Sequence, residues 1–485
     1  MAGEAALTSY MTRDEIMAYR PEVLPDDGST PLERARRRMI ATGHWNDAQH
    51  QGRRWAIGCV ALEITQRCNL DCTLCYLSEN SEAVKDIPLD EVFRRIDTIF
   101  EMYGPNADVQ VTGGDPTLRK REELVEIVRR IRQKGMRPSL FTNGIKATRD
   151  LLSELAEAGL VDVAFHVDMT QQRRGYASEV ELNRIRQDYI ERARGLGLSV
   201  MFNTTAYNGN FHEIPAIVEF FVRNSDVVRL CSFQLQADTG RGVERERAVV
   251  ISQDTVQAQI EKGAGTRIAF DTAGVGHPSC NRYAMTLVAN GRVHDVFDDK
   301  EFITHALKES ADLQFDRTQR KKALETLADW IVRHPWILTS GTAWAAKKLW
   351  AMKSDLIASR GKIGKLSFFI HNFMDACHLE KNRVDACVFT VATAEGPISM
   401  CLHNAKRDEF ILKPLKVKAE GIVERFWNPL TGAVDDETPG DGPLAVPAAH
   451  RMPVKGRQKE QRKRAKTTPA GSAVLPQTLP DEAAE

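Results

Sequence analysis

Three cysteines stand close together as Cys68, Cys72 and Cys75, directly after the apolar run 60–65. The spacing C-x3-C-x2-C places three thiols in one short loop, whereas structural zinc sites and most electron-transfer iron–sulfur clusters take four protein ligands. A four-iron cluster held by three cysteines keeps one iron free to bind a substrate or a cofactor. The loop therefore predicts a reactive metal centre. The alternatives are a four-coordinate zinc site, completed by a residue such as His44 or Cys59, and thiols that are clustered by chance.

A second motif, Gly113-Gly114-Asp115-Pro116, closes the next apolar run, 109–112. Glycine adopts positive φ without steric cost and lets the backbone approach a ligand closely, while proline fixes the path of the chain. Peptide groups freed at such a turn can bind an ammonium or a carboxylate group. Alone, the tetrapeptide also fits an ordinary turn.

Together the two motifs resemble the signatures of radical S-adenosylmethionine (SAM) enzymes. In that family the free iron binds the amino and carboxylate groups of SAM, and the reduced cluster cleaves SAM to methionine and a 5′-deoxyadenosyl radical. The resemblance implies that Cys68, Cys72 and Cys75 hold a [4Fe–4S] cluster. It also implies that the backbone of Gly113, Gly114, Asp115 and Pro116 binds SAM, with Asp115 replacing the family's usual glutamate.

Residues 60–236 alternate strand-like and helix-like stretches in six units with short connections, a pattern typical of a parallel sheet. We expect an α/β fold, a partial (β/α)6 TIM-like barrel, which the resemblance also implies. In such barrels the chemistry lies at the carboxyl ends of the strands, where the cysteine loop falls. Asp168 and Asn203 end the fourth and fifth strands and are candidate SAM-binding residues, Asp168 for the ribose hydroxyls. Polar residues are also common at strand ends without any such role.

Cysteines beyond the barrel predict a second metal site. Cys387 and Cys401 flank two apolar runs joined by Glu395-Gly396, a β-hairpin pattern whose base brings both thiols together. It resembles the C-terminal hairpin that binds an auxiliary iron–sulfur cluster in many radical SAM enzymes, with Cys280 and Cys377 completing four ligands. Two alternatives stay open: a cluster with one ligand missing whose iron binds substrate, and buried thiols without metal. His277 and His403 are reserve ligands.

The expected organisation is a polar N-terminal extension (1–54), the barrel core (55–245), a connecting and helical region (246–370), an auxiliary-cluster region (371–429) and a disordered tail (430–485). Asn290-Gly291 predicts a type I′ hairpin. Residues 302–374 are expected to be mostly helical and carry four tryptophans among lysines and arginines. That composition fits an amphipathic layer with a solvated basic face, or a peripheral contact with an anionic membrane surface.

Composition limits the function classes. Lys and Arg total 66, as do Asp and Glu, so no overall field favours a specific nucleic-acid partner. The nine cysteines, without a secretory signal, indicate a reducing compartment. No window is long and apolar enough for a membrane span. We expect a cytoplasmic protein, at most peripheral to a membrane.

Within the family, the similarity over about 60–410 is to tetraether lipid synthases and archaeal methyltransferase-like relatives. Three segments carry it: 233–241, 277–280, and the set 372–376, 383–387 and 401–404. This resemblance implies hydrogen abstraction from an unactivated C–H bond on a lipid alkyl chain, for C–C bond formation or methylation. Those relatives have extra N-terminal cysteines, whereas residues 1–58 contain none, and Gly276-His277 stands where another cysteine is expected.

Two other functions remain in view: a peptide or protein maturase with an auxiliary cluster, and a zinc-stabilised binding protein on a decayed barrel. The radical chemistry requires an electron donor such as flavodoxin or ferredoxin. Candidates for quenching a product radical, with nothing to rank them, are Tyr76, Tyr207, Tyr283, Cys59 and Cys231.

Overall fold

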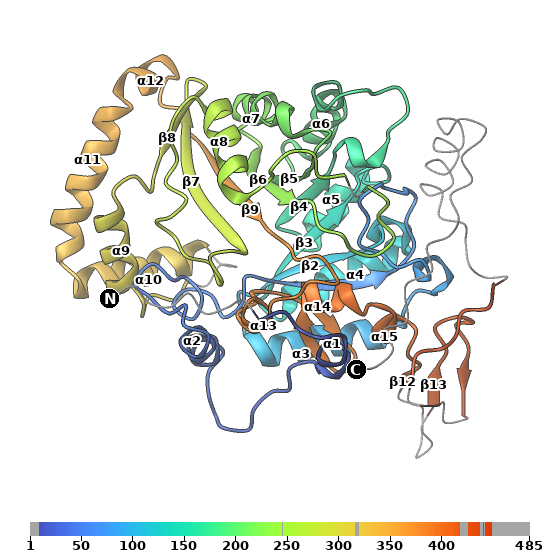
Figure 1. Ribbon diagram of the computed structural model, residues 1–485. Coiled ribbons are helices and arrows are strands. Elements are labelled where there is room, and N and C mark those ends of the chain that lie inside the picture. Colours follow the sequence, from blue (N-terminus) through green and yellow to red (C-terminus); the bar gives the residue numbers. More distant parts are fainter. Residues whose placement is uncertain are drawn as a thin grey trace, which may run out of the picture.

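A computed structural model describes residues 9–448, apart from 245, 316–319, 418–424, 437–439 and 441. In this part of the chain, one large sheet has the strand order β11-β10-β1-β2-β3-β4-β5-β6-β9-β7-β8 (Figure 1). Its first six strands in sequence are parallel neighbours: β1 (Cys59–Thr65), β2 (Asp108–Gly113), β3 (Arg137–Thr142), β4 (Asp162–His166), β5 (Ser199–Ala206) and β6 (Val228–Leu235). The six predicted β/α units and the α/β fold class are confirmed.

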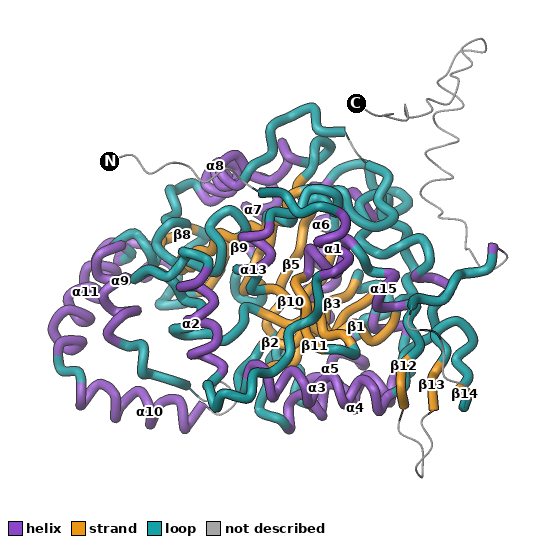
Figure 2. The backbone as a smooth tube through the Cα atoms, turned by 60° about the horizontal axis from the view of Figure 1, so that its bottom comes forward, coloured by secondary structure: helices purple, strands orange, loops and turns teal. Residues whose placement is uncertain are grey.

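Five helices connect these strands and cover the outer face of the sheet (Figure 2): α3 (Leu89–Tyr103), α4 (Arg121–Gln133), α5 (Arg149–Glu157), α6 (Glu179–Ala193) and α7 (Ile214–Arg223). Each presents one apolar stripe to the strands, as Val92, Ile96 and Ile99 of α3 do, all fully buried. Thr148 and Ser178 cap the start of α5 and α6 with their side chains. The helices thereby hold the carboxyl ends of the strands at one rim.

Two further parallel strands flank the six. β9 (Gly364–His371) pairs with β6, and β10 (Phe389–Thr393) pairs with β1. The ring centroids of Phe369 on β9 and Phe389 on β10 lie 5.9 Å apart. Because these strands border opposite ends of the six-stranded run, their contact shows that the sheet curves round on itself. The prediction of mainly helical structure up to residue 374 was wrong for 364–371, which form β9.

Both predicted hairpins are present. β7 (Asn281–Ala289) pairs antiparallel with β8 (Arg292–Asp295) and with β9. Asn290 and Gly291 have φ of 52° and 72°, as a type I′ turn requires. β11 (Gly396–Ser399) pairs antiparallel with β10 and forms the C-terminal hairpin.

The remaining helices lie around this sheet: α1 (Arg13–Ala18), α2 (Pro31–Ala41), α8 (Gln253–Ala264), α9 (Lys300–Glu309), α10 (Arg320–Arg333), α11 (Thr342–Ala351), α12 (Lys353–Ala358), α13 (Lys381–Asp385), α14 (Met400–Ala405) and α15 (Asp408–Ile411). Short 3₁₀ segments are η1 (Ser81–Ala83), η2 (Pro116–Leu118), η3 (Met169–Gln171) and η4 (Phe211–Glu213), and η5 (Ile337–Gly341) is π-helical. The N-terminal extension packs on the C-terminal region, with Met11 and Ile16 buried against Leu379 and Leu402.

The predicted start of the disordered tail at residue 430 was too early. A small sheet contains β12 (Leu415–Val417), β13 (Arg425–Trp427) and β14 (Val434–Asp435). Val446 is buried beside Val84 and Leu412, and Leu444 N donates to Leu412 O at 3.0 Å. Residues 449–485, with the rest of the prediction, lie outside the described residues. Among the described helices, none has the length and apolar character needed to cross a bilayer.

Candidate active site

The cysteine loop lies at the carboxyl end of β1, and backbone hydrogen bonds join it to two other segments of the chain. Thr73 N donates to Thr170 O at 2.8 Å, which joins the loop to η3 after β4. Gly242 N donates to Cys75 O at 3.1 Å, which joins it to the segment after β6. The thiols of Cys68, Cys72 and Cys75 are all free and partly exposed. The loop therefore bridges strand ends far apart in the sequence.

Burial favours the protonated form of two thiols in the cysteine loop. Burial raises the pKa of Cys68 to about 12, and burial followed by the charges of Cys75 and Asp168 raises that of Cys72. The buried Arg241 opposes these effects and pairs with Glu82 at 3.0 Å. Ligation to iron supplies positive charge that stabilises the thiolates. In the part of the chain that the structure describes, no three His, Cys, Asp or Glu side chains form a group that could hold a single metal ion.

The Gly113–Pro116 turn presses against the backbone that leads into the cysteine loop. A Cβ atom on Gly113, whose φ is 131°, would lie 2.0 Å from Thr65 O, and one on Gly114 would lie 2.1 Å from Arg67 O. Gly114 N donates to Thr65 O at 2.9 Å and Asp115 N to Arg67 O at 2.8 Å. Only glycine fits these two positions, and the turn forms a cradle of backbone beside the thiols.

The Asp115 carboxylate joins the ends of β2 and β3. It is fully buried and accepts from Thr117 N at 3.0 Å, Thr142 Oγ1 at 2.9 Å and Asn143 N at 2.9 Å. Asn143 Nδ2 in turn donates to Asn69 Oδ1 in the cysteine loop at 2.6 Å. Asp115 thus holds the turn against the end of β3 through its side chain, while its backbone N donates to Arg67 O.

Asp168 joins the ends of β4 and β5 in the same way that Asp115 joins the ends of β2 and β3. Its buried carboxylate accepts from Thr170 N at 3.0 Å and Thr205 N at 2.8 Å, and Oδ2 lies 2.7 Å from His166 Nε2. Both aspartates therefore open an Asp-x-Thr segment and bond to the end of the following strand. Asn203 is buried on β5 opposite His166. SAM binding by Asp168 and Asn203 stays a prediction.

His166 is the polar residue at this rim that the sequence analysis missed. It ends β4 with its side chain 33% exposed, between Asp168 Oδ2 and Thr205 Oγ1. Burial lowers its pKa, but the adjacent Asp168 carboxylate outweighs burial, so the net pKa is raised. The pair can hold a proton on Nε2 beside the cysteine loop. The available signal was a histidine two positions before Asp168, on the same face of the strand.

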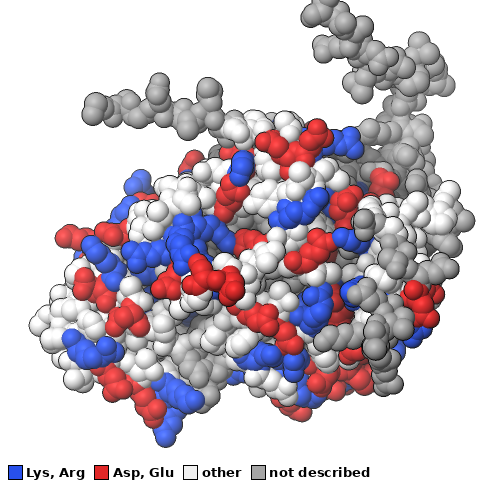
Figure 3. Space-filling view, turned by 90° about the horizontal axis from the view of Figure 1, so that it is seen from below, with Lys and Arg blue, Asp and Glu red and all other residues white. Residues whose placement is uncertain are grey.

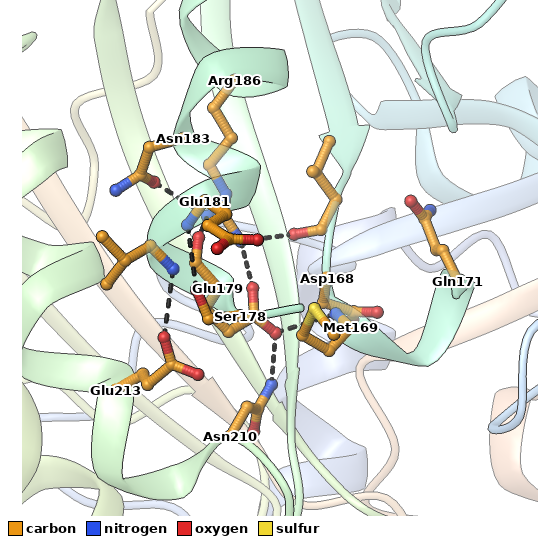
Figure 4. A network of polar contacts seen from close by, with 12 residues as sticks. Asp168, Met169, Gln171, Ser178, Glu179, Glu181, Asn183, Arg186, Asn210 and Glu213 are labelled. Atoms are coloured by element: carbon orange, nitrogen blue, oxygen red, sulfur yellow. Dashed lines mark hydrogen bonds and ion pairs between the residues drawn. The ribbon is translucent and has the colours of Figure 1, made fainter. Parts of the chain in front are cut away.

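A buried ion pair on α6 is hydrogen-bonded to the backbone at the start of η3 (Figure 4). Glu179 and Arg186 on α6 are fully buried and bonded to each other. Glu179 Oε1 accepts from Met169 N at 2.9 Å and from Asn210 Nδ2 at 2.7 Å, while Arg186 Nη2 donates to Val167 O at 2.8 Å. The network fixes the backbone on both sides of Asp168.

Three of the four C-terminal cysteines interact electrostatically. Burial raises the pKa of Cys280 to about 11, against the effect of Arg383, whose Nε lies 3.2 Å from its Sγ. Burial raises the pKa of Cys401, and the charges of Cys387 and Cys280 raise it further. Cys377 is exposed, with its Sγ 3.2 Å from His378 Nδ1, and is not among the charges that act most strongly on these thiols.

Partly exposed aromatic rings line the contact between β9 and β10. Tyr283 lies 5.8 Å from Phe369, and His371 lies 4.7 Å from Phe389 and 5.5 Å from Phe373, all between ring centroids. Cys387 Sγ donates to Phe389 O at 3.0 Å, so the wall adjoins the C-terminal cysteines. We call these five rings the aromatic wall.

Residues 62–221 match the family model of the Radical SAM superfamily. The chain is 32% identical over 190 residues to the 7,8-dihydro-6-hydroxymethylpterin dimethyltransferase of Methanocaldococcus jannaschii, covering 38% of this chain and 37% of that protein. It is 31% identical over 168 residues to the PqqA peptide cyclase of Bradyrhizobium diazoefficiens, covering 34% of this chain and 43% of that one. The matches thus span less than half the length of either relative. Streptococcus suis SuiB bound to S-adenosylmethionine aligns with a TM-score of 0.34 at 14% identity, over 42% of this chain and 46% of that one.

Residues 62–221 therefore resemble a radical SAM domain, and the two relatives that match this part of the chain bear the names of enzymes. Such a domain implies a [4Fe–4S] cluster and SAM. The residues fit these groups: three soft thiols in one loop suit iron, and the two glycines bring the backbone of the turn against Thr65 and Arg67, directly before the cysteine loop.

Proposed function

We propose that this enzyme reductively cleaves SAM at a [4Fe–4S] cluster held by Cys68, Cys72 and Cys75, and that the 5′-deoxyadenosyl radical takes a hydrogen atom from an unactivated C–H bond. The observation that carries this proposal is the direct link between the two motifs: Tyr76, next to Cys75, donates from its hydroxyl to Gly113 O at 2.5 Å. A cluster ligand and the SAM cradle are therefore held in one fixed relation.

We propose the following roles for the protein's own groups, based on their positions around the cysteine loop. The backbone of Gly113–Pro116 receives the amino group of SAM, and Asp115 holds that backbone in place. His166 and Asp168 lie at the next rim position, where the histidine Nε2–H can donate to a SAM or substrate oxygen. The electron comes from a reduced flavodoxin or ferredoxin, since the reaction consumes one electron for each SAM cleaved.

The substrate class we propose is a lipid alkyl chain, modified by methylation or C–C bond formation. The aromatic wall supports this class because its three phenylalanine rings, Phe369, Phe373 and Phe389, offer an apolar surface to a hydrocarbon. The similarity to a relative named as a dimethyltransferase is consistent with a carbon-methylating reaction.

A second cluster near the aromatic wall is part of the proposal. Its proposed ligands are Cys280, Cys387 and Cys401, with Cys377 as the fourth; Cys280 and Cys387 are close enough to Cys401 that their charges would raise its pKa. If Cys377 does not ligate, the fourth iron is open to substrate.

The second candidate function is peptide modification. The similarity to a PqqA peptide cyclase favours it. A peptide substrate requires polar partners for its backbone, whereas an alkyl chain does not. Product formation with lipid extracts and with peptides separates the two candidates.

The decisive experiment is anaerobic reconstitution followed by iron and sulfide counting and assay of 5′-deoxyadenosine with a reductant. We expect about eight irons in the wild type, about four and no 5′-deoxyadenosine after Cys68→Ala/Cys72→Ala/Cys75→Ala, and about four after Cys387→Ala/Cys401→Ala. Cys231→Ala is the matched control, because this cysteine is buried on β6 and is not a proposed ligand. A colourless, zinc-bound wild type would overturn the proposal, and about four irons in the wild type would remove the second cluster.

A further inference from the structure

The segment 321–363, here called the helical arm, exposes large apolar side chains. Val332, Ile357 and Trp350 are 81%, 79% and 71% exposed. Four others are also exposed: Leu324, Leu338, Leu349 and Ile363. Single exposed apolar residues are ordinary, but seven within one segment form a patch that requires an explanation.

The exposed residues follow helical faces. On α10, Leu324, Ala328 and Val332 are spaced four apart and all exposed. On α11, Ala346, Leu349 and Trp350 share the outer face. Each helix therefore presents an apolar stripe away from the protein.

The opposite side of the arm is anchored by tryptophans. Trp330 is buried, and its Nε1 donates to Asp312 Oδ1 at 3.0 Å. Trp344 stacks on Phe302 of α9 with ring centroids 5.2 Å apart, and Trp336 lies 4.8 Å from His305. The arm thus already has a packed inner face, and its outer apolar stripes are a separate surface.

The arm carries more basic than acidic residues, although Arg333, Lys347 and Lys348 pair with aspartates outside it. It has three acidic residues, of which Asp355 is buried beside His294. Its eight basic residues are Lys321, Lys322, Arg333, Lys347, Lys348, Lys353, Arg360 and Lys362. Lys353 Nζ lies 3.7 Å from the Trp350 ring centroid, so a cation and an outward aromatic ring stand together. Figure 3 shows uncharged surface at its left edge, where Figures 1 and 2 place α11, bordered by both basic and acidic side chains.

We propose that the helical arm binds the surface of an anionic phospholipid bilayer, lying in the interface without crossing it. Apolar stripes bordered by lysines match this environment, since the apolar side chains enter the acyl boundary while the lysines reach headgroup phosphates. Charge complementarity selects this partner over a second protein copy, because two like-charged arms repel. The inference is independent of the reaction that the enzyme performs.

The test is co-sedimentation of the full chain with vesicles of phosphatidylcholine alone and of phosphatidylcholine mixed with phosphatidylglycerol. We expect binding only to the mixed vesicles, weakening as salt increases. Leu349→Ser/Trp350→Ser/Ile357→Ser should weaken it at least about tenfold, and Lys321→Glu/Lys322→Glu should weaken it about threefold or more.

The matched control is Val180→Ser/Val250→Ser, which removes exposed apolar side chains elsewhere and should bind as the wild type does. The basic run 455–466 is present in every variant, so it cannot account for a difference between them. Each variant should retain wild-type 5′-deoxyadenosine formation, which shows that it is folded. The proposal is overturned if the wild type ignores anionic vesicles, if the arm variant binds them normally, or if the arm variant only converts a dimer to a monomer.

Discussion

Tyr76 and Gly113 are joined by a 2.5 Å hydrogen bond from the tyrosine hydroxyl to the glycine carbonyl. The Tyr76 ring lies under the Arg407 guanidinium, 4.8 Å away, and Arg407 pairs with the buried Glu63 of β1 at 2.7 Å. Burial, and then the charge of Glu63, raise the pKa of Tyr76, so its hydroxyl stays protonated and remains a donor. The residue after the third cysteine thereby couples the loop to the glycine turn.

Replacing Tyr76 by Phe should weaken SAM binding more than it slows turnover. A lost hydrogen bond of about 1 kcal/mol corresponds to a rise of about fivefold in KM for SAM. Initial rates of 5′-deoxyadenosine formation against SAM concentration measure this change. Tyr103→Phe is the control, since Tyr103 is a buried tyrosine at the end of α3, beside Glu22 and Arg38 of the N-terminal extension, and its change should leave KM unaltered. An unaltered KM in Tyr76→Phe would show that the coupling has no role in binding.

Asp115→Asn should destabilise the protein by about 2 kcal/mol, because an amide nitrogen replaces an acceptor that faces three donors. Urea unfolding of the apoprotein measures the free energy of unfolding. The exposed Asp150 on α5 supplies the control, and its change to Asn should alter stability by no more than about 0.5 kcal/mol. Equal stability of the two variants would mean that the Asp115 contacts contribute nothing.

The Glu179–Arg186 pair should show strong non-additivity. Arg186→Met leaves a buried carboxylate without its cation and should cost about 3–5 kcal/mol. The double variant Glu179→Leu/Arg186→Met removes both charges and should cost less than the sum of the single variants. Thermal or urea unfolding gives the free energy of unfolding of the wild type, the two single variants Glu179→Leu and Arg186→Met, and the double variant. Simple additivity would show that the two residues act separately.

Acid should destabilise the fold through His371. Burial lowers the pKa of His371 to about 3, while an unfolded histidine titrates near 6.5. The unfolded state therefore binds a proton first, and stability falls as pH drops from about 6.5 toward 3, by at most about 1.4 kcal/mol per unit. The free energies of unfolding of the wild type and of His371→Phe, measured between about pH 6.5 and pH 3, test this prediction. The variant should show a shallower decline, and identical slopes would exclude His371 as the cause.

Local patterns in the sequence were enough to predict the cysteine loop, the glycine turn and the six β/α units. The helical period of α3 and the Asn290-Gly291 turn depend on neighbouring residues alone, so they can be read without the fold. β9 was missed because it follows a helical region and its partner β6 lies far back in the chain. His166 was missed because one polar residue at a strand end has no distinctive spacing. The partners of Asp115, which are Thr142 and Asn143, come from the next β/α unit and emerge only in three dimensions.

The parallel register that joins Cys59 on β1 to Phe389 on β10 has a consequence for how the protein is made. During synthesis β1 to β6 leave the ribosome early and pair with near neighbours, whereas β10 emerges much later. Bringing two such distant segments together closes a long loop and is slow. The nascent chain therefore passes through a stage in which the barrel rim is assembled while its β1 edge is still unpaired. During that interval β1, which leads into the cysteine loop, has its partner β2 on one side and no partner on the other until β10 arrives.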